Sequence, residues 1–409
     1  MSSHPQRVTF MGSQGTELAA RLDLPAGPPK AFALFAHCFT CSKDVFAASR
    51  IAAALTDCGL GVLRFDFTGL GSSGGEFANT NFSSNTEDLR LAAAWLVEQH
   101  QGPQLLIGHS LGGAAVLAVA GDLSTVRAVA TIGAPSALTH VEGLLGDALQ
   151  QIEADGEAEV CLAGRTFRIR RQFIDDLRSV PLLDRVASMH RSLLLLHSPT
   201  DQHVGIEHAA ALYNAARHPK SFVALDGADH LLTDRRDAVF AAQMIATWAE
   251  RFLADHSMTE PAPTPTAQVV VAETTQGTFL NHVVVGRHHF LADEPESVGG
   301  FDAGPSPYDL LAAALGACTS MTLRLYADRK KLPLDRVLVE VEHAKVHAED
   351  CEECAEGRTG LVDRIERRIH LTGELDPEQR ASLLAIADRC PVHRSLESSV
   401  TIVTELAGD

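Results

Sequence analysis

The stretch Leu105–Ala118, LLIGHSLGGAAVLA, decides the fold of the first part of this 409-residue chain. An apolar run precedes the motif Gly108-His109-Ser110-Leu111-Gly112, and small residues that suit a helix follow it. Glycines allow a tight turn between strand and helix, and such a turn lifts the serine hydroxyl out of the sheet. We therefore predict that Ser110 is a nucleophile and that the N–H of Leu111, at the helix start, helps to bind an oxyanion.

Strand and helix signals alternate around this motif. Apolar strand-like runs lie at 31–36, 61–67, 105–108, 126–132, 193–197 and 221–225, and helical stretches lie at 45–58, 85–100 and 206–217. This order predicts an α/β fold with a mostly parallel sheet and helices on both faces. Residues 136–190 interrupt the alternation with two helix-like pieces around a short segment at Val160–Arg168. We interpret this insertion as a lid.

A serine hydroxyl needs a base to take its proton and a third group to orient that base. His230 ends the loop after the run Ser221–Leu225, and Asp201 lies on the loop after Leu193–His197. The chain order Ser110, Asp201, His230 is typical of α/β hydrolases. The alternatives nearby are His203, a solvated helical His208, and an Asp229 whose side chain we expect to point away from the site.

The second oxyanion donor should come from the loop after the early strand that ends at Ala36, and Phe39 N–H is the candidate. Cys38 and Cys41 form a C-x2-C in the same loop. No second ligand pair lies close to them in sequence, so we expect packed thiols rather than a metal site.

The composition limits the class of protein. A formal net charge of −18 argues against nonspecific binding to nucleic acid or to an anionic membrane. Residues 1–10 contain no apolar signal region, and we expect no membrane span and a cytoplasmic protein. The eight cysteines are then expected to be thiols rather than a disulfide framework.

A second domain follows a proline-rich linker. Pro261, Pro263 and Pro265 alternate within residues 256–267, which cannot continue a helix and therefore separate a domain at 1–255 from one at 268–409. In the second domain we predict strands at 268–274, 281–287, 337–346, 361–371 and 400–406, with helices at 306–331 and 377–389. Strands grouped around two helices indicate an α+β domain.

Two cysteines of this domain attract attention. Leu311, Ala314, Cys318, Met321 and Leu325 recur at helical spacing, so we expect Cys318 on a buried face. Taken alone, that pattern favours a packed structural cysteine. Cys390, however, precedes Pro391, and a helix starting there would favour a thiolate.

A further cluster, His343, His347, Cys351 and Cys354, has spacing that would allow zinc binding. The two histidines lie far apart along one strand, and the acidic residues around the cysteines suit a solvated loop. We expect no metal and no cofactor.

Residues 1–255 resemble the α/β-hydrolase carboxylesterases. Arg64–Gly69, with Gly71–Phe77 behind it, is similar to the corresponding segment of cinnamoyl or feruloyl esterases, which also carry a short lid. Those enzymes usually have His-Gly where this chain has His37-Cys38. The resemblance implies hydrolysis of small acyl or hydroxycinnamate esters by a Ser-His-Asp triad.

Residues 268–409 resemble the OsmC/Ohr family of thiol peroxidases. The matching segments are Gly304–Leu311, Leu315–Thr319, Tyr326–Lys330 and Arg389–His393. The resemblance implies that Cys318 attacks a peroxide, that Cys390 resolves the sulfenic acid, that Arg287 holds the thiolate, and that the domain forms an intertwined homodimer. Where the peroxidases place a glutamate this chain has Tyr308, and Asp309 is one residue away.

Three hypotheses follow. The leading one is a cytosolic esterase that acts on a small-molecule ester and is assembled as a homodimer by its C-terminal domain. In the second, reduction of an organic hydroperoxide with a thiol reductant is the main activity. In the third, the C-terminal domain is a dimer scaffold without enzymatic activity. The Tyr308/Asp309 departure supports the scaffold, and the intact cysteine pair opposes it.

Overall fold

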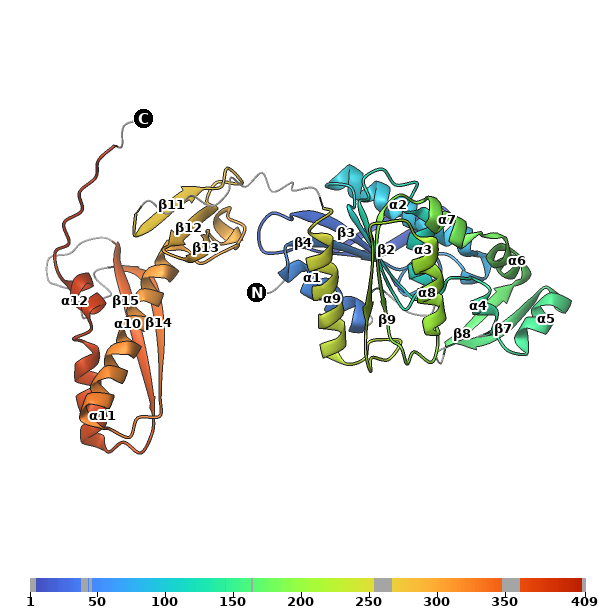
Figure 1. Ribbon diagram of the computed structural model, residues 1–409. Coiled ribbons are helices and arrows are strands. Elements are labelled where there is room, and N and C mark those ends of the chain that lie inside the picture. The colour runs from blue at the N-terminus through green and yellow to red at the C-terminus, as the bar shows by residue number, and fades with distance from the viewer. Residues whose placement is uncertain are drawn as a thin grey trace. The chain divides into compact units, whose positions relative to one another are not determined.

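The computed structural model describes residues 5–37, 43, 46–143, 145–162, 165–253, 267–347 and 361–406. The chain forms two compact units, Met1–Met258 and Thr259–Asp409, and the division falls inside the predicted proline-rich linker. Figure 1 shows the elements of both units.

The first unit is built on an eight-stranded sheet with the order β1-β2-β4-β3-β5-β6-β9-β10. β1 and β2 are antiparallel to each other, β2 is antiparallel to β4, and the remaining neighbours are parallel. The strands are β1 Gln6–Met11, β2 Glu17–Asp23, β3 Ala31–Ala36, β4 Leu60–Phe65, β5 Leu105–His109, β6 Ala128–Ile132, β9 Ser192–His197 and β10 Lys220–Ala224.

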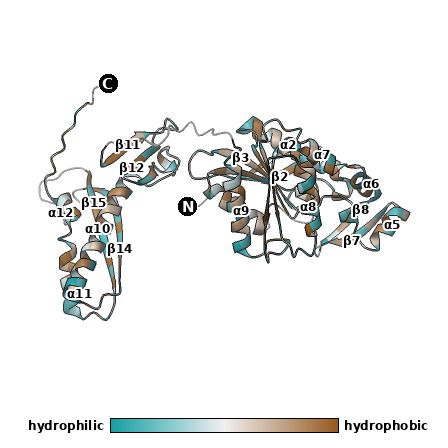
Figure 2. Ribbon diagram, in the orientation of Figure 1, coloured by the Kyte–Doolittle hydropathy of each residue, from teal (hydrophilic) through white to brown (hydrophobic). Residues whose placement is uncertain are grey.

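Helices cover both faces of this sheet (Figure 1). They are α1 Phe46–Asp57, α2 Phe82–Gln99, α3 Leu111–Val119, α8 Ile206–Ala215 and α9 Arg235–Ala249, with the short 3-10 helix η1 at Phe77–Asn79. The central strands β3, β4, β5, β6 and β9 are buried on both faces, which explains their continuous apolar sequence. They contribute to the hydrophobic colour of the unit in Figure 2.

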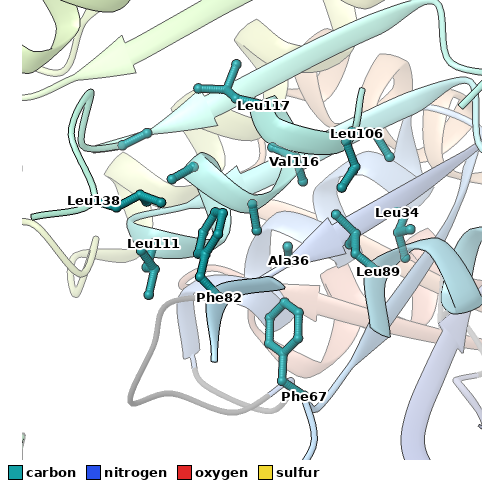
Figure 3. Packing of buried hydrophobic residues seen from close by; sticks show 14 of the residues in the cluster. Leu34, Ala36, Phe67, Phe82, Leu89, Leu106, Leu111, Val116, Leu117 and Leu138 are labelled. Carbon is teal, nitrogen blue, oxygen red and sulfur yellow. The ribbon is translucent and has the colours of Figure 1, made fainter. Parts of the chain in front are cut away.

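One of the two hydrophobic layers packs around α3. Figure 3 shows Leu111, Val116 and Leu117 of this helix among Phe82 and Leu89 of α2 and Leu106 of β5. Every residue of α3 except Ala118 is buried. The helix that follows Ser110 is therefore held from all sides, and so is the position of that serine.

The predicted lid, residues 136–190, lies between β6 and β9. It contains α4 His140–Gly143, α5 Ala148–Asp155, the hairpin β7 Glu157–Leu162 and β8 Arg165–Arg170, α6 Arg171–Ser179, and α7 Leu182–Ser188. Its Phe167 ring packs edge-on against Phe77 at 5.1 Å, and Asp176 accepts hydrogen bonds from the backbone and hydroxyl of Ser83. These contacts attach the insertion to η1 and the start of α2.

The second unit has a three-stranded antiparallel sheet and a long hairpin. The sheet contains β11 Val269–Glu273, β12 Asn281–Val285 and β13 His288–Ala292, and the hairpin pairs β14 Arg336–His347 with β15 Leu361–Thr372. The helices are η2 Glu296–Val298, α10 Pro307–Lys330, α11 Pro377–Ala387 and α12 Pro391–Glu397. α10 packs on β14, α11 and α12.

Two expectations for this unit were wrong for a single chain. The buried residues of α10 are Leu315, Thr319, Leu323 and Ala327, whereas Met321 and Leu325 of the predicted buried stripe are 66% and 71% exposed. The helix has apolar residues on several faces, and β14, α11 and α12 leave Met321 and Leu325 uncovered. Residues 400–406 form no strand, and Ile402 is 84% exposed.

The expectation of no membrane span stays a prediction. By length and composition α10 is apolar enough to cross a membrane, although only 22% of its most apolar window is buried. One such helix is weak evidence for a membrane protein. Its exposed apolar residues do show that part of α10 lacks cover in one chain.

Candidate active site

Ser110 occupies a strained turn between β5 and α3. It is the residue before the helix. Its backbone has φ 55° and ψ −125°, a conformation that residues other than glycine rarely adopt. A Cβ on Gly108 would lie 2.4 Å from the carbonyl oxygen of Gly112, and one on Gly112 would lie 2.3 Å from that of Ala36. The motif therefore needs both glycines, as the sequence predicted.

The structure brings the three predicted side chains together. His230 Nε2 lies 3.0 Å from Ser110 Oγ, and His230 Nδ1 lies 2.7 Å from Asp201 Oδ2. The side chains of His230 and Asp201 are 8% and 2% exposed. Because Asp201 accepts from Nδ1–H, Nε2 is left with the lone pair that accepts from the serine hydroxyl.

The loop after β9 fixes the carboxylate of Asp201. Its Oδ1 accepts hydrogen bonds from the backbone N–H of His203 at 2.8 Å and of Val204 at 3.0 Å. Burial alone would raise the pKa of Asp201, but the hydrogen bonds from His230 and from these two N–H groups lower it to about 2. The carboxylate is therefore ionised across the neutral pH range.

The alternative residues have other roles. Asp229 accepts from the backbone N–H and hydroxyl of Thr233, so its side chain points away from the triad, as predicted. The ring of His203 lies 5.2 Å from that of His230. His208 is half-buried and accepts from Ser136 N–H at 3.1 Å, so the expectation that it is solvated was wrong. Ser136, which follows β6, and the ring of His140, 4.8 Å from that of His208, lie against it.

His109 is a residue that the sequence analysis overlooked. It precedes the serine, is buried, and its Nε2–H donates to the carbonyl of His230 at 2.6 Å. Burial, reinforced by the neighbouring His230, lowers the pKa of His109 to about 4. The ring is thus neutral at pH 7 and anchors the backbone of the base. Its place inside the motif was the only signal for it.

A small cavity opens at the start of α3. It is lined by the apolar side chains of Phe67, Leu70, Phe82, Leu111 and Ala115, together with His37, Asn85 and Gly112. Leu111 is the first residue of the helix, so its N–H has no acceptor within the helix. Phe39, the second predicted oxyanion donor, lies outside the described residues, as do Cys38 and Cys41.

Buried charged side chains form hydrogen bonds next to the loop that follows β3. Asp66 is fully buried and accepts from Lys43 N at 2.6 Å, from Lys43 Nζ at 2.8 Å and from Ser72 N at 2.9 Å. Arg64 pairs with Asp23 at 2.7 Å. The Arg64–Phe77 segment that carried the esterase resemblance therefore supports the end of the loop after β3.

The second unit brings Cys318 and Cys390 together. Cys390 is buried at the start of α12, where its sulfur accepts from His393 N–H at 3.3 Å and lies 3.6 Å from Thr319 Oγ1. Burial would raise the pKa of Cys390, but hydrogen bonds from His393, Thr319 and Cys318, with the charge of Arg367, lower it. Both cysteines are free thiols.

The arginine at these thiols is not the predicted one. Arg287 is exposed at the turn between β12 and β13, whereas Arg367 on β15 donates to Thr319 Oγ1 at 2.8 Å and pairs with Asp388 at 2.8 Å. β15 carries many charged residues on both of its faces, so the sequence gave little indication that Arg367 faces α10. Asp309 caps α10 by accepting from Ser306 N and Oγ.

The described part of the chain holds no group of three or more His, Cys, Asp or Glu residues arranged for a metal ion. His343 is hydrogen-bonded to Asp363 at 2.9 Å and stacks on Tyr308 at 4.1 Å between ring centroids. Cys351 and Cys354 lie outside the described residues.

The chain matches two family models. Residues 27–152 match the model described as "Serine aminopeptidase, S33", a family of α/β hydrolases, and residues 300–405 match that of OsmC-like proteins. Among curated proteins, YfhR of Escherichia coli K12 is 25% identical over 251 residues, covering 59% of this chain and 79% of its own length.

Solved structures resemble the first unit. The esterase domain of a Rhodothermus marinus protein is 56% identical and covers 61% of this chain and 100% of its own, with a TM-score of 0.53. Est1E from Butyrivibrio proteoclasticus, solved with ferulic acid, is 19% identical over 60% of this chain and 100% of its own, also with a TM-score of 0.53, which shows the fold alone. The chain therefore belongs to the α/β-hydrolase family and carries an OsmC-like domain after its hydrolase domain.

Proposed function

We propose that this protein is a serine carboxylesterase with Ser110 as nucleophile, His230 as general base and Asp201 as the group that orients the base. The observation that carries the proposal is the chain of two hydrogen bonds, 3.0 Å from Ser110 to His230 and 2.7 Å from His230 to Asp201. The name of the Rhodothermus marinus relative, an esterase domain at 56% identity, supports the same class of reaction.

In the first half of the reaction, His230 Nε2 takes the proton of Ser110 as Oγ attacks the ester carbonyl. Negative charge develops on the carbonyl oxygen, and the N–H of Leu111 is positioned to stabilise it, with Phe39 N–H as the second proposed donor. His230 then protonates the leaving alcohol. In the second half, His230 removes a proton from water, which attacks the acyl-enzyme and releases the acid.

Small acyl or hydroxycinnamate esters are the proposed substrates. The cavity beside Leu111 is narrow and mostly apolar, and the Asn85 side chain is the neutral polar group in its lining. The described part of this cavity encloses only about 10 Å³, which leaves no room for a long lipid chain. The ferulic acid complex of Est1E, a protein of the same fold, is consistent with this choice.

Covalent labelling tests the nucleophile directly. A fluorophosphonate reagent should modify one serine of the full-length protein, and peptide mass spectrometry should locate the adduct on Ser110. His230→Ala should slow labelling strongly, because the hydroxyl then lacks its base. Labelling of another serine, or equal labelling of Ser110→Ala, would contradict the assignment.

A thiol peroxidase activity of the OsmC-like domain is the second candidate, favoured by the contact between the two cysteines. In this reaction the thiolate of Cys318 attacks the outer oxygen of an organic hydroperoxide, forming a sulfenic acid and releasing an alcohol. Cys390 then displaces water from the sulfenic acid to form a disulfide, which an external dithiol reduces. Both steps suit the reducing cytoplasm expected for a chain with free thiols.

We also propose that the OsmC-like domain forms a homodimer. Met321, Leu325 and Leu338 are 66%, 71% and 47% exposed in one chain, and Val400 to Leu406 is an extended apolar segment without a partner strand among the described residues. A second copy related by a two-fold axis would cover such surfaces, which is the commonest arrangement of soluble oligomers.

A further inference from the structure

A basic pocket lies in the hydrolase domain away from the triad. It has a volume of about 550 Å³, and its wall includes Arg127, Arg191, Arg217 and Arg251. We call it the arginine pocket. Val126, Met189 and Phe252 add an apolar side to it. This volume is in the range of small-molecule sites in proteins.

The arginine pocket lies at the amino ends of the parallel strands, and the triad lies at their carboxyl ends. Arg127, Arg191 and Arg217 precede β6, β9 and β10, and Arg251 follows α9. Ser110, Asp201 and His230 instead follow β5, β9 and β10. β9 has six residues, Ser192–His197, and a strand rises by about 3.3 Å per residue, so the two sites are about 20 Å apart. A ligand of this pocket does not touch the reacting ester.

The four guanidinium groups have no acidic partner among the described residues. Asp122, which lies close in sequence to one wall, is paired with Arg90 at 2.9 Å and with Arg185 at 3.8 Å. Arg191 donates to the carbonyls of His190 and Leu123, but its buried Nε has no hydrogen-bond partner. This N–H is therefore free of protein acceptors among the described residues and can donate to a bound ligand.

Helix ends offset only part of this charge. The helices α7, α8 and α9 end one or two residues before pocket residues, and each carboxyl end carries about −0.5 of a charge. Three helix ends thus contribute about −1.5 against the four positive charges of the arginines. The remaining charge of about +2.5 is unusual in a chain whose net charge is −18, and it calls for an anion of two or three charges.

We propose that the arginine pocket binds an organic diphosphate. The planar forks of arginine side chains bind phosphate oxygens in pairs, and the charge of a diphosphate ester matches that of the pocket. The rings of Phe252 and Trp248, 4.9 Å apart, support the apolar side, where the organic group would pack. The proposal is independent of the identity of the ester substrate.

Isothermal titration of the full-length protein at constant ionic strength tests this site. ADP should bind, inorganic pyrophosphate should bind more weakly, and adenosine should not bind. The double variant Arg127→Gln/Arg217→Gln removes two exposed arginines and should weaken ADP binding by about tenfold to a hundredfold. Arg235→Gln is the matched control, since it removes an exposed arginine at the opposite end of α9.

Hydrolysis of a short-acyl ester should be unchanged in these variants, which verifies that they fold. Should the double variant fail to fold, Arg251→Gln alone takes its place. Binding of ADP with unchanged affinity in the folded variants would overturn the proposal, because the ligand would then bind elsewhere. Equal binding of adenosine, or no binding of either diphosphate at millimolar concentration, would overturn it as well. Pyrophosphate binding as tight as that of ADP would contradict the proposal that the pocket binds an organic diphosphate, because the organic group would then add nothing to binding.

Discussion

The two candidate sites of this chain differ in how much of their surroundings one chain supplies. The triad lies in a domain with hydrophobic layers on both faces of its sheet, and Asp201 and His230 are 2% and 8% exposed. Cys318 of the thiol pair lies on a helix that is open on another face, with Met321 66% and Leu325 71% exposed. A single copy therefore supplies all three side chains of the triad, whereas the OsmC-like domain leaves apolar surface that a second copy would cover.

Their anchoring also differs. Ser110 is fixed by backbone geometry, since its turn depends on glycines whose Cβ positions are occupied by neighbouring carbonyl groups. Cys390 contacts the hydroxyl of Thr319 on α10, and that hydroxyl in turn accepts a hydrogen bond from Arg367 of β15. Ester hydrolysis should therefore be insensitive to the state of the second domain, while thiol chemistry should depend on individual contacts and on assembly.

The largest expected effect is that of Ser110→Ala on ester hydrolysis. The triad acts as a unit, so kcat with a short-acyl nitrophenyl ester should fall by about 10³-fold or more. Cys318→Ser should leave the same rate unchanged, because its helix belongs to the other unit. Near-normal turnover by Ser110→Ala would remove the esterase assignment, and a large loss in Cys318→Ser would end the independence of the two sites.

The next effect is on assembly. Met321→Glu/Leu325→Glu places two charges on the open face of α10 and should convert a dimer into a monomer, since burying unpaired carboxylates at an interface is strongly unfavourable. Light scattering of the wild type should give about twice the mass of 43.7 kDa. Val97→Glu, on an exposed residue of α2, is the control and should remain dimeric. A monomeric wild type would contradict the proposal.

The sequence predicted the hydrolase site well because its signals are local. The glycine motif, the strand before Asp201 and the loop that holds His230 each act within a few residues, and buried parallel strands are continuous apolar runs. β1 and β2 were not predicted, since their burial alternates and charged residues interrupt them. His109 was missed because its contact is with a residue far along the chain.

The thiol site was predicted less well because its contacts are not local. Arg287 was chosen by resemblance, yet Arg367 reaches the pair through strand pairing and packing that no sequence spacing reveals. The stripe through Met321 follows helical spacing, but which face of an apolar helix is buried depends on what packs against it. The strand expected at Val400–Leu406 has the right pattern and no partner strand among the described residues.

A smaller effect is expected for substrate choice. The narrow apolar cavity beside Leu111 should make acetyl and feruloyl esters better substrates than a sixteen-carbon acyl ester, with kcat/KM higher by about tenfold or more. A panel of nitrophenyl and methyl esters with the full-length protein measures this. Leu70→Ala should widen the cavity and reduce the preference, whereas Leu396→Ala, in the other unit, should not change it. Faster turnover of the long-chain ester by the wild type would refute the proposed substrate class.

The smallest expected effect concerns Arg367. Its charge helps to lower the pKa of the Cys390 thiol, against the burial that raises it. Arg367→Gln should therefore raise that pKa and reduce the thiolate fraction at pH 7. Alkylation of Cys390 by iodoacetamide, followed by peptide mass spectrometry across pH, should show a midpoint displaced to higher pH.

The midpoint pH of Cys390 alkylation distinguishes an electrostatic role of Arg367 from a structural one. Arg367 also donates to the carbonyl of Ala387 at 3.2 Å, so its loss could loosen α11 and expose the thiol. Exposure would raise the alkylation rate at every pH, whereas loss of the charge moves the midpoint and leaves the plateau unchanged. Arg368→Gln removes an exposed arginine beside it on the same strand and should change neither quantity. An unchanged midpoint in Arg367→Gln would assign that arginine to packing alone.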